Sequence, residues 1–271
     1  MTAPSLTGRA VFVTGGSRGL GREMALALAE AGANVAITGS RPSRPLDETL
    51  AELKSRTAAL AFVADATDAV AIGHAVKAVV SAFGRLDVLI NNAGLGMRAI
   101  SETFNTTPAN FWEADVDAWR RIVETNVHGP FLAARAVVPH MLARRFGKII
   151  NISTSDITMI RNGYSPYGPT KAFLEAASRA WAVELAGTGV DVNVLLPGGA
   201  TDTDLLPPSP NKRGADGHLL SPEIMRAPIC WLASDASNGV TGGRFIARLW
   251  PDDHDVPGAA RVDTGETPSI M

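Results

Sequence analysis

Tyr167 and Lys171 stand four residues apart in the segment "YGPTK", a spacing that suits proton transfer. A phenol has an unperturbed pKa of about 10, so it needs a nearby cation to exchange a proton readily at neutral pH. Residues four apart share one face of a helix, which would bring the Lys171 ammonium next to the Tyr167 hydroxyl. The other tyrosine, Tyr164, has Gly168 at that offset and gains no such neighbour. Tyr167 is therefore the candidate acid–base residue.

Pro169 lies between the two residues and would disrupt the interior of a helix, because proline lacks a backbone N–H and clashes with the preceding turn. The first helical N–H groups have no intrahelical partner, so proline is tolerated in the first turn. We therefore predict that this helix begins near Pro166. Upstream, residues 153–155 read "STS" and offer three hydroxyl groups that can donate hydrogen bonds.

A glycine-rich segment near the N-terminus is the second candidate site. Gly15, Gly19 and Gly21 lie between a short apolar run and a helical pattern. Glycine permits a tight turn there and lets a pyrophosphate approach the backbone N–H groups at a helix N-terminus. A glycine triplet alone also fits an ordinary strand-to-helix turn. Its place at the start of an alternating chain favours the nucleotide site.

Short apolar runs alternate with amphipathic stretches along almost the whole chain. The runs are continuous, as expected for strands covered on both faces, and the alternation implies parallel strands with right-handed crossovers. The sequence therefore predicts an α/β fold of the Rossmann type: a doubly wound, mostly seven-stranded parallel sheet with helices on both faces. The expected strands are residues 9–15, 34–38, 58–64, 86–92, 147–153, 190–196 and 244–247. The expected helices are residues 20–31, 68–83, 116–145, 167–187 and 222–234.

The composition favours one folded, cytoplasmic domain. Of the 271 residues, 46% are hydrophobic and 19% are charged, which allows a large buried core. The net charge of −2 gives no support for nucleic acid or an anionic membrane as a partner, and no apolar run approaches the ~18 residues of a membrane span. The single cysteine excludes an internal disulfide, the histidines lack metal-ligand spacing, and the N-terminus lacks a signal-peptide pattern. We expect no metal site, one dinucleotide-binding and catalytic domain over residues 1–250, and a C-terminal tail over 251–271.

Five motifs in a fixed order resemble the short-chain dehydrogenase/reductase family, in its single-domain branch. The resemblance covers about residues 6–247. It implies hydride transfer between a nicotinamide cofactor and a ketone or secondary alcohol, and a homotetramer or dimer. An ordered set of motifs is far more specific than a glycine triplet. The motifs are "TGGSRGLG" at 14–21, "NNAG" at 91–94, Asn126 of "TNVHG", Tyr-x-x-x-Lys at 167–171 and Pro-Gly at 197–198.

The resemblance also implies catalytic roles. Tyr167 would be the general acid/base, Lys171 would shift the phenol pKa and bind the nicotinamide ribose, and the backbone carbonyl of Asn126 would hold a water of a proton relay. The position of the family's catalytic serine, 13 residues before the tyrosine, is Thr154 here. Ser155 lies one residue later. Counting favours Thr154 and the unhindered serine hydroxyl favours Ser155, so both stay open as the group that polarises the substrate oxygen.

The cations near the expected ribose site favour NADP(H) over NAD(H). An Asp or Glu at the end of the second strand usually accepts the 2′-hydroxyl of NAD, and Gly39 stands there in this chain. In family members that use NADP, basic residues at the positions of Arg18 and Arg41 hold the phosphate. The cofactor-binding set that follows is Gly15, Ser17, Arg18, Gly19, Leu20, Gly21, Ser40, Arg41, Asp65, Ala66, Asn92, Ala93, Gly94, Tyr167, Lys171, Pro197, Gly198, Ala200, Thr201 and Thr203.

Three segments depart from the family pattern. The Pro-Gly stretch has threonines at Thr201 and Thr203 instead of the usual offset, which leaves open which one contacts the cofactor. The link over residues 95–125 is several residues longer than in the family. The tail over 251–271 replaces the usual ending and fits either an arm to a neighbouring subunit or a disordered end.

Two alternative functions use the same fold. A non-catalytic dinucleotide-binding or sensing protein would not need the intact pair Tyr167 and Lys171, which argues against it. A lyase or epimerase with the same cofactor belongs to the longer branch, and little sequence follows the sixth strand for a second domain. The leading interpretation is therefore an oxidoreductase with a small carbonyl or alcohol substrate.

Overall fold

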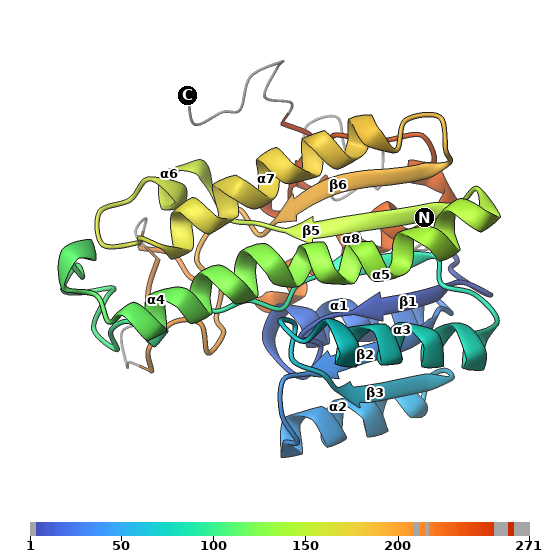
Figure 1. Ribbon diagram of the computed structural model, residues 1–271, viewed down its shortest axis with the longest axis horizontal. Helices are drawn as coiled ribbons and strands as arrows, with labels where there is room; N and C mark the ends of the chain where they lie inside the picture. Colours follow the sequence, from blue (N-terminus) through green and yellow to red (C-terminus); the bar gives the residue numbers. More distant parts are fainter. Residues whose placement is uncertain (1–3, 209–211, 215–216, 252–259, 263–271) are drawn as a thin grey trace.

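The computed structural model describes residues 4–208, 212–214, 217–251 and 260–262 (Figure 1). Its centre is a sheet of seven parallel strands in the order β3-β2-β1-β4-β5-β6-β7. This order is the doubly wound arrangement, in which the chain starts in the middle and builds outward in both directions. The predicted fold is confirmed. The strands are β1 (Ala10–Val13), β2 (Asn34–Gly39), β3 (Ala59–Val63), β4 (Val88–Asn91), β5 (Gly147–Ile152), β6 (Val190–Leu196) and β7 (Arg244–Ile246).

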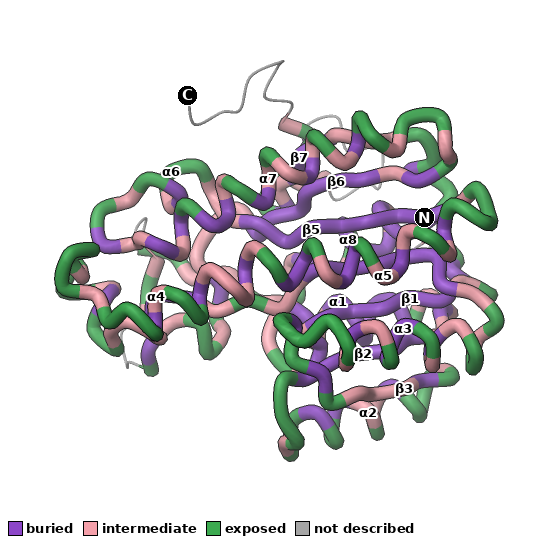
Figure 2. Tube along the Cα trace, viewed as in Figure 1, coloured by how far each residue is buried: buried purple, intermediate pink, exposed green. Residues whose placement is uncertain are grey.

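Helices cover both faces of the sheet. One core, built on Met24, Leu28 and Ile229, joins α1, α2 and α8 to one face. A second core, built on Phe12 and Val137, joins α3, α5 and α7 to the other, so the strands lie buried between two helical layers (Figure 2). The helices are α1 (Gly19–Glu30), α2 (Arg44–Lys54), α3 (Ala69–Phe83), α4 (Val116–Val123), α5 (Gly129–Arg144), α6 (Asp156–Met159), α7 (Tyr167–Glu184) and α8 (Arg226–Ala233).

Two predicted helices have local features that affect the site. The expected helix over 116–145 is divided into α4 and α5 by a π-helical turn, Glu124–His128, which carries Asn126. The other is α7, which begins at Tyr167 with Pro166 as its N-cap residue, as the position of Pro169 predicts. Tyr167 and Lys171 therefore both lie in the first turns of one helix.

Part of the C-terminal tail lies beside the edge strand of the same chain. The N–H of Ile246 donates to the carbonyl of Ala260 at 2.9 Å, and the N–H of Val262 donates to the carbonyl of Arg244 at 2.8 Å. These bonds form an antiparallel bridge between Phe245 and Arg261, which gives β7 a partner on its outer side. The remaining tail positions lie outside the described residues, and so does the prediction of an arm or a disordered end that concerns them.

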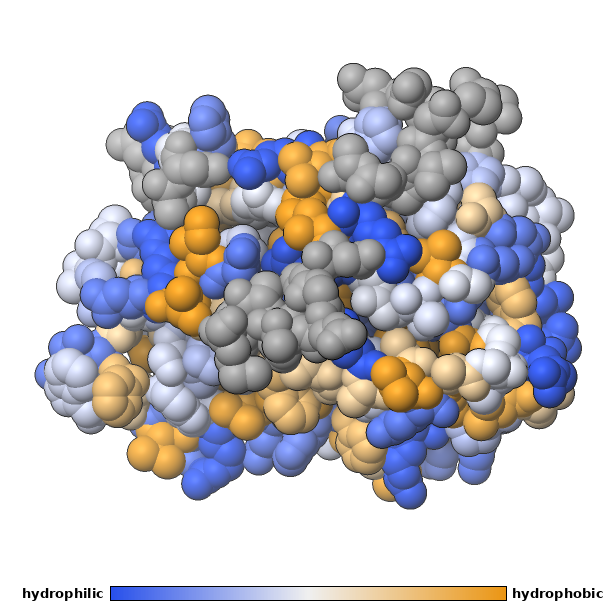
Figure 3. Space-filling model, turned by 90° about the horizontal axis from the view of Figure 1, so that it is seen from above, coloured by the Kyte–Doolittle hydropathy of each residue, from blue (hydrophilic) through white to orange (hydrophobic). Residues whose placement is uncertain are grey.

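The surface seen from the top of Figure 1 mixes hydrophilic and hydrophobic side chains in small groups (Figure 3). This mixture agrees with a net charge close to zero, −2. Within the described part of the chain, none of the helices combines the length and the apolar character that crossing a membrane requires.

Candidate active site

The candidate residues gather at the carboxyl ends of the parallel strands. The strand order reverses between β1 and β4, and in doubly wound sheets ligands bind in the crevice at this switch point. The glycine-rich loop follows β1, "NNAG" includes the end of β4, and the hydroxyl segment follows β5. In Figure 1, α4 and α6 extend beyond this edge of the sheet, on the left of the view.

Two positions of the glycine-rich loop, Gly15 and Gly21, are packed so closely that a side chain would not fit there. A Cβ on Gly21 would lie 2.2 Å from the carbonyl oxygen of Gly15, and Gly15 itself has a φ of +65°. The Oγ1 of Thr14 accepts hydrogen bonds from the backbone N–H groups of Asn92 and Ala93, each at 3.1 Å. The structure thus joins the loop to "NNAG". The first turn of α1 contains no acidic residue, which leaves its positive end suited to a phosphate group.

The end of β2 carries no carboxylate of the kind typical of NAD-binding enzymes, and a side chain there would meet a close neighbour. A Cβ on Gly39 would lie 3.2 Å from Cδ2 of Leu46, a residue of α2 that packs into the core. Ser40 and Arg41 follow as exposed residues. Arg18 is also exposed and forms an ion pair of 3.0 Å with Asp204. Arg41 and Arg18 are therefore the cations near the end of β2, and Arg18 is paired with the Asp204 carboxylate.

The other predicted adenine and nicotinamide contacts lie along the same edge. The carboxylate of Asp65, just after β3, accepts hydrogen bonds from the backbone and hydroxyl of Thr67. Pro197 follows β6, and its carbonyl accepts a 3.0 Å hydrogen bond from the N–H of Arg248. The remaining positions of the set belong to the same loops: Ser17, Gly19 and Leu20 after β1, Ala66 after β3, Gly94 after β4, and Gly198 and Ala200 after β6.

The two threonines after the Pro-Gly motif differ in their surroundings. Thr201 is buried, and its hydroxyl donates to the carbonyl of Gly199 at 3.4 Å. Thr203 lies over the glycine-rich loop, with Cγ2 3.2 Å from the position of a Cβ on Gly19. Thr203 is therefore the one placed beside the N-terminus of α1.

Lys171 is buried and Tyr167 is partly buried at the start of α7. Burial raises the pKa of Tyr167 to about 12, and a hydrogen bond with the Thr154 side chain offsets part of this rise. Lys171 is 6% exposed, and its Nζ donates a 2.8 Å hydrogen bond to the carbonyl of Ile152, the last residue of β5. Burial lowers the pKa of Lys171 to about 8, while the charge of Glu175 opposes the change. The phenol is thus protonated at neutral pH.

The structure distinguishes the two candidate hydroxyl residues. Ser155 is the N-cap residue of α6: its Oγ accepts from the N–H of Thr158 at 3.4 Å and lies 2.9 Å from the Thr158 hydroxyl. Thr154 is the residue whose side chain lowers the pKa of Tyr167. The geometry therefore favours Thr154, the residue that counting selects, over Ser155.

Asn126 is fully buried, and its side chain is occupied by structural hydrogen bonds. Its Oδ1 accepts from the N–H of Leu95 at 2.8 Å, and its Nδ2 donates to the carbonyl of Leu95 and the hydroxyl of Thr170. A Cβ on Gly94 would lie 3.3 Å from this Oδ1 and 3.8 Å from Nζ of Lys171, so the three residues converge. The π-helical turn sets the position of this asparagine, as such turns often do at functional sites.

The structure adds residues that the motifs did not indicate. Phe104 packs edge to face against Tyr164 with ring centroids 5.4 Å apart, and the Arg161 guanidinium lies 4.7 Å from the centroid of the Tyr164 ring. The long 95–125 link thus reaches the segment just before α7. Glu175, which stands four residues after Lys171, was detectable from spacing alone. Among the described residues, no group of three or more His, Cys, Asp or Glu side chains is placed to hold a metal ion.

Comparisons with known proteins agree with this geometry. The family model for short chain dehydrogenases matches residues 9–214. A 3-oxoacyl-[acyl-carrier-protein] reductase of Thermotoga maritima is 31% identical over 244 residues, covering 88% of this chain and 95% of the relative. A 2,5-dichloro-2,5-cyclohexadiene-1,4-diol dehydrogenase of Sphingobium indicum is 32% identical over 247 residues, covering 89% and 94%.

Solved structures show the same relationship. A putative short-chain alcohol dehydrogenase from Sinorhizobium meliloti matches with a TM-score of 0.78 and 30% identity, over 91% of this chain and 97% of that one. A 3-ketoacyl-(acyl-carrier-protein) reductase from Brucella melitensis, solved with NADH, matches with a TM-score of 0.77 and 30% identity, over 89% and 96%. The chain belongs to the short-chain dehydrogenase family and is a nicotinamide-dependent oxidoreductase.

Proposed function

We propose that the protein is an NADP(H)-dependent carbonyl reductase or alcohol dehydrogenase that acts on a ketone or secondary alcohol, with Tyr167 as general acid/base. The observation that carries the proposal is the arrangement around this phenol. The Thr154 side chain lowers the pKa of this phenol, and the ammonium of Lys171 lies one turn further along α7, which supports a site with a proton donor, a polarising hydroxyl and a cation.

The chain's own residues fit the cofactor. The exclusion of side chains at Gly15 and Gly21 and the positive end of α1 leave backbone N–H groups available to a pyrophosphate. When bound, the nicotinamide ring supplies or accepts the hydride. Lys171 would hold the nicotinamide ribose, and Thr203 would contact the phosphates from above the loop.

Proton transfer follows from the pKa values. A phenol with a pKa of about 12 holds its proton at neutral pH, so Tyr167 is ready to protonate a substrate oxygen as the carbonyl is reduced. Thr154 would donate a hydrogen bond to the same oxygen and stabilise its developing charge. The Asn126 side chain is already bonded, so its role in proton return would fall to its backbone carbonyl and a water.

The preference for NADP(H) rests on charge and space at the adenosine end. Arg18 and Arg41 supply cations for a 2′-phosphate, and a side chain at position 39 would press against Leu46. We expect tighter binding of NADPH than of NADH in a fluorescence titration. Equal affinity, or tighter binding of NADH, would contradict this preference.

The test of the activity is a screen of ketones with the preferred cofactor, followed by Tyr167→Phe. We expect this variant to lose at least about 100-fold in kcat while still binding cofactor, because only the proton donor is removed. Tyr164→Phe is the matched control, because it removes the other phenol and leaves the Tyr167–Lys171 pair in place. Wild-type turnover in Tyr167→Phe would overturn the assignment.

Exposed apolar residues support a homo-oligomer. Phe131 and Leu142 of α5 are 48% and 40% exposed, and Phe173 and Val183 of α7 are 51% and 77% exposed. Apolar groups on two adjacent helices favour burial against a second copy. Light scattering should give the mass of a dimer or tetramer, and a monomer at micromolar concentration would contradict the proposal.

A further inference from the structure

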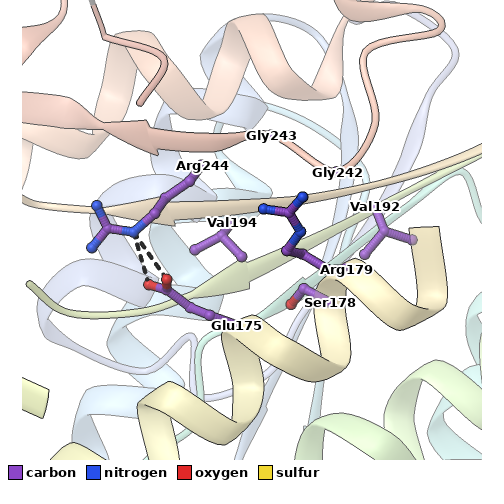
Figure 4. A pocket seen from close by; sticks show the side chains of 8 residues that line it. All are labelled: Glu175, Ser178, Arg179, Val192, Val194, Gly242, Gly243 and Arg244. Carbon is purple, nitrogen blue, oxygen red and sulfur yellow. Dashed lines mark hydrogen bonds and ion pairs between the residues drawn. The ribbon is translucent and has the colours of Figure 1, made fainter. Parts of the chain in front are cut away.

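Glu175 of α7 and Arg244 of β7 form an ion pair directly behind the candidate catalytic residues. The Nε of Arg244 donates to both carboxylate oxygens of Glu175, at 2.9 and 3.2 Å. The two side chains are only 15% and 8% exposed. Figure 4 shows them pointing toward each other across the space between the helix and the strand, with Arg179 one turn further along α7.

The same guanidinium also contacts the hydroxyl segment. Its Nη2 donates to the carbonyl oxygen of Thr154 at 3.3 Å and lies 4.0 Å from the carboxylate of Asp156. Arg244 thus uses different nitrogens of its planar fork to hold Glu175 and the backbone of Thr154. The Thr154 side chain in turn lowers the pKa of the Tyr167 phenol. Arg244 thus holds the backbone of a residue that acts on the phenol.

The second contact of the pair is electrostatic. Glu175 stands one helical turn after Lys171, and its charge favours the protonated form of this buried lysine. The charged groups that face Glu175 are Arg244 from β7, Arg179 and Lys171 from α7, and Asp156 from α6. Burial raises the pKa of Glu175, and the charge of Arg244 opposes this rise.

A buried ion pair is a weak source of stability, since the loss of hydration offsets much of the attraction. The contacts to Thr154 and Lys171 give this pair a different purpose. We propose that the Glu175–Arg244 pair is a positioning element of the active site, in which Arg244 fixes Thr154 against Tyr167 and Glu175 supports the ammonium of Lys171. This inference rests on the proposed function for the roles of Thr154 and Lys171.

The role proposed for Arg244 can be tested without a substrate. The chain has only two tyrosines, so Tyr164→Phe leaves Tyr167 as the single position that takes up a fluorinated tyrosine. The ¹⁹F resonance of 3,5-difluorotyrosine then reports the ionisation of residue 167 alone. The fluorinated phenol is more acidic than that of natural tyrosine, so it titrates at a lower pH, at which the protein can be measured. The variant to compare is Arg244→Lys, because one ammonium can keep the ion pair with Glu175 but lacks the second donor arm toward Thr154.

In this background we expect Arg244→Lys to raise the pKa of the phenol by about half a unit or more, because a hydrogen bond that favours the phenolate is weakened. Arg179→Lys is the matched control: it makes the same change on a neighbouring arginine that lines the same hollow, and the phenol pKa should stay at its parent value. An unchanged phenol pKa in Arg244→Lys, with or without a lower melting temperature, would overturn the proposal. If the wild-type protein turns over no ketone or alcohol, the proposed function is wrong. The titration still tests whether Arg244 positions Thr154 near the phenol.

The role proposed for Glu175 is tested by the pH profile of kcat/KM of the active enzyme. In Glu175→Gln the Lys171 ammonium loses a favourable charge, so the pKa of Lys171 falls further and the alkaline limb of kcat/KM moves to lower pH. Lower activity without a moved limb would show a purely structural role and would overturn the proposal for Glu175. Glu175→Asp keeps the charge and should return the limb toward its wild-type position.

Discussion

The side chain of Thr154, just after the end of β5, lowers the pKa of Tyr167 in the first turn of α7. The neighbouring Ser155 instead caps α6 through Thr158. A serine at the position of Thr154 is the family pattern, so this chain carries the same hydroxyl with an extra methyl group. The methyl restricts the rotation of the side chain, and the lowered pKa of Tyr167 indicates that the hydroxyl lies near the phenol.

Thr154→Val and Ser155→Ala should therefore have different effects. We expect Thr154→Val to lower kcat by about 100-fold, because the substrate oxygen loses a hydrogen-bond donor. Ser155→Ala should keep kcat and lower the free energy of unfolding by about 0.5–2 kcal/mol, the usual effect of losing an N-cap. Steady-state kinetics and urea denaturation measure both effects. Thr154→Ser is the control that restores the donor, and a loss of kcat in Ser155→Ala alone would reverse the assignment.

The sequence predicts the layout of this site better than its detail. The seven apolar runs coincide with the seven strands within one or two residues at nearly all ends, because buried parallel strands leave a continuous apolar signal. The start of α7 followed from Pro169 by the same kind of local argument. The hydroxyl contact depends instead on where the chain turns after β5, and counting residues does not fix that turn.

The helix α2 shows a different limit of sequence reasoning. Its first residues, Arg44 and Pro45, follow a serine and another proline and look like a loop, although proline suits the first turn of a helix. The ion pair of Glu175 with Arg244 joins residues 69 positions apart in the chain. Such contacts follow from the strand order, which places β7 next to β6, and not from any local pattern.

Arg41 should determine part of the cofactor preference. We expect Arg41→Ala to raise the KM for NADPH about tenfold or more and to leave the KM for NADH unchanged, because only NADPH carries the phosphate. Arg44→Ala is the matched control, since Arg44 is a nearby, well-exposed arginine that pairs with Glu48. Equal changes with both cofactors would show that Arg41 does not contact the phosphate.

Two glycines should respond oppositely to the same substitution. In Gly21→Ala the new Cβ would meet the Gly15 carbonyl at 2.2 Å and the Asn92 Nδ2 at 2.4 Å, so the loop must shift and cofactor binding should be lost. Gly73 lies inside α3, and a Cβ there meets nothing within 4 Å. Gly73→Ala should therefore stabilise the fold by up to about 1 kcal/mol through helix propensity. Urea denaturation and cofactor titration of both variants check this, and normal cofactor binding by Gly21→Ala would contradict the close packing of the loop.

Lys171 should make the stability of the protein depend on pH in a defined window. The pKa of Lys171 is about 8 in the folded protein, whereas an unperturbed lysine has a pKa of about 10.4. Between these values the unfolded chain binds more protons than the folded one, so the contribution of Lys171 to stability rises as the pH rises. Each pH unit in the window adds up to about 1.4 kcal/mol.

The measurement is the free energy of unfolding of the wild type minus that of Lys171→Met, from urea denaturation at pH 7 to 10. We expect this difference to grow in favour of the wild type above about pH 8, because the folded protein then no longer carries a buried ammonium. Lys77→Met, which removes an exposed lysine from α3, controls for the substitution itself. A difference between wild type and Lys171→Met that stays constant from pH 7 to 10 would mean that Lys171 is solvated in the folded state, and it would also remove the reason for a carboxylate at position 175.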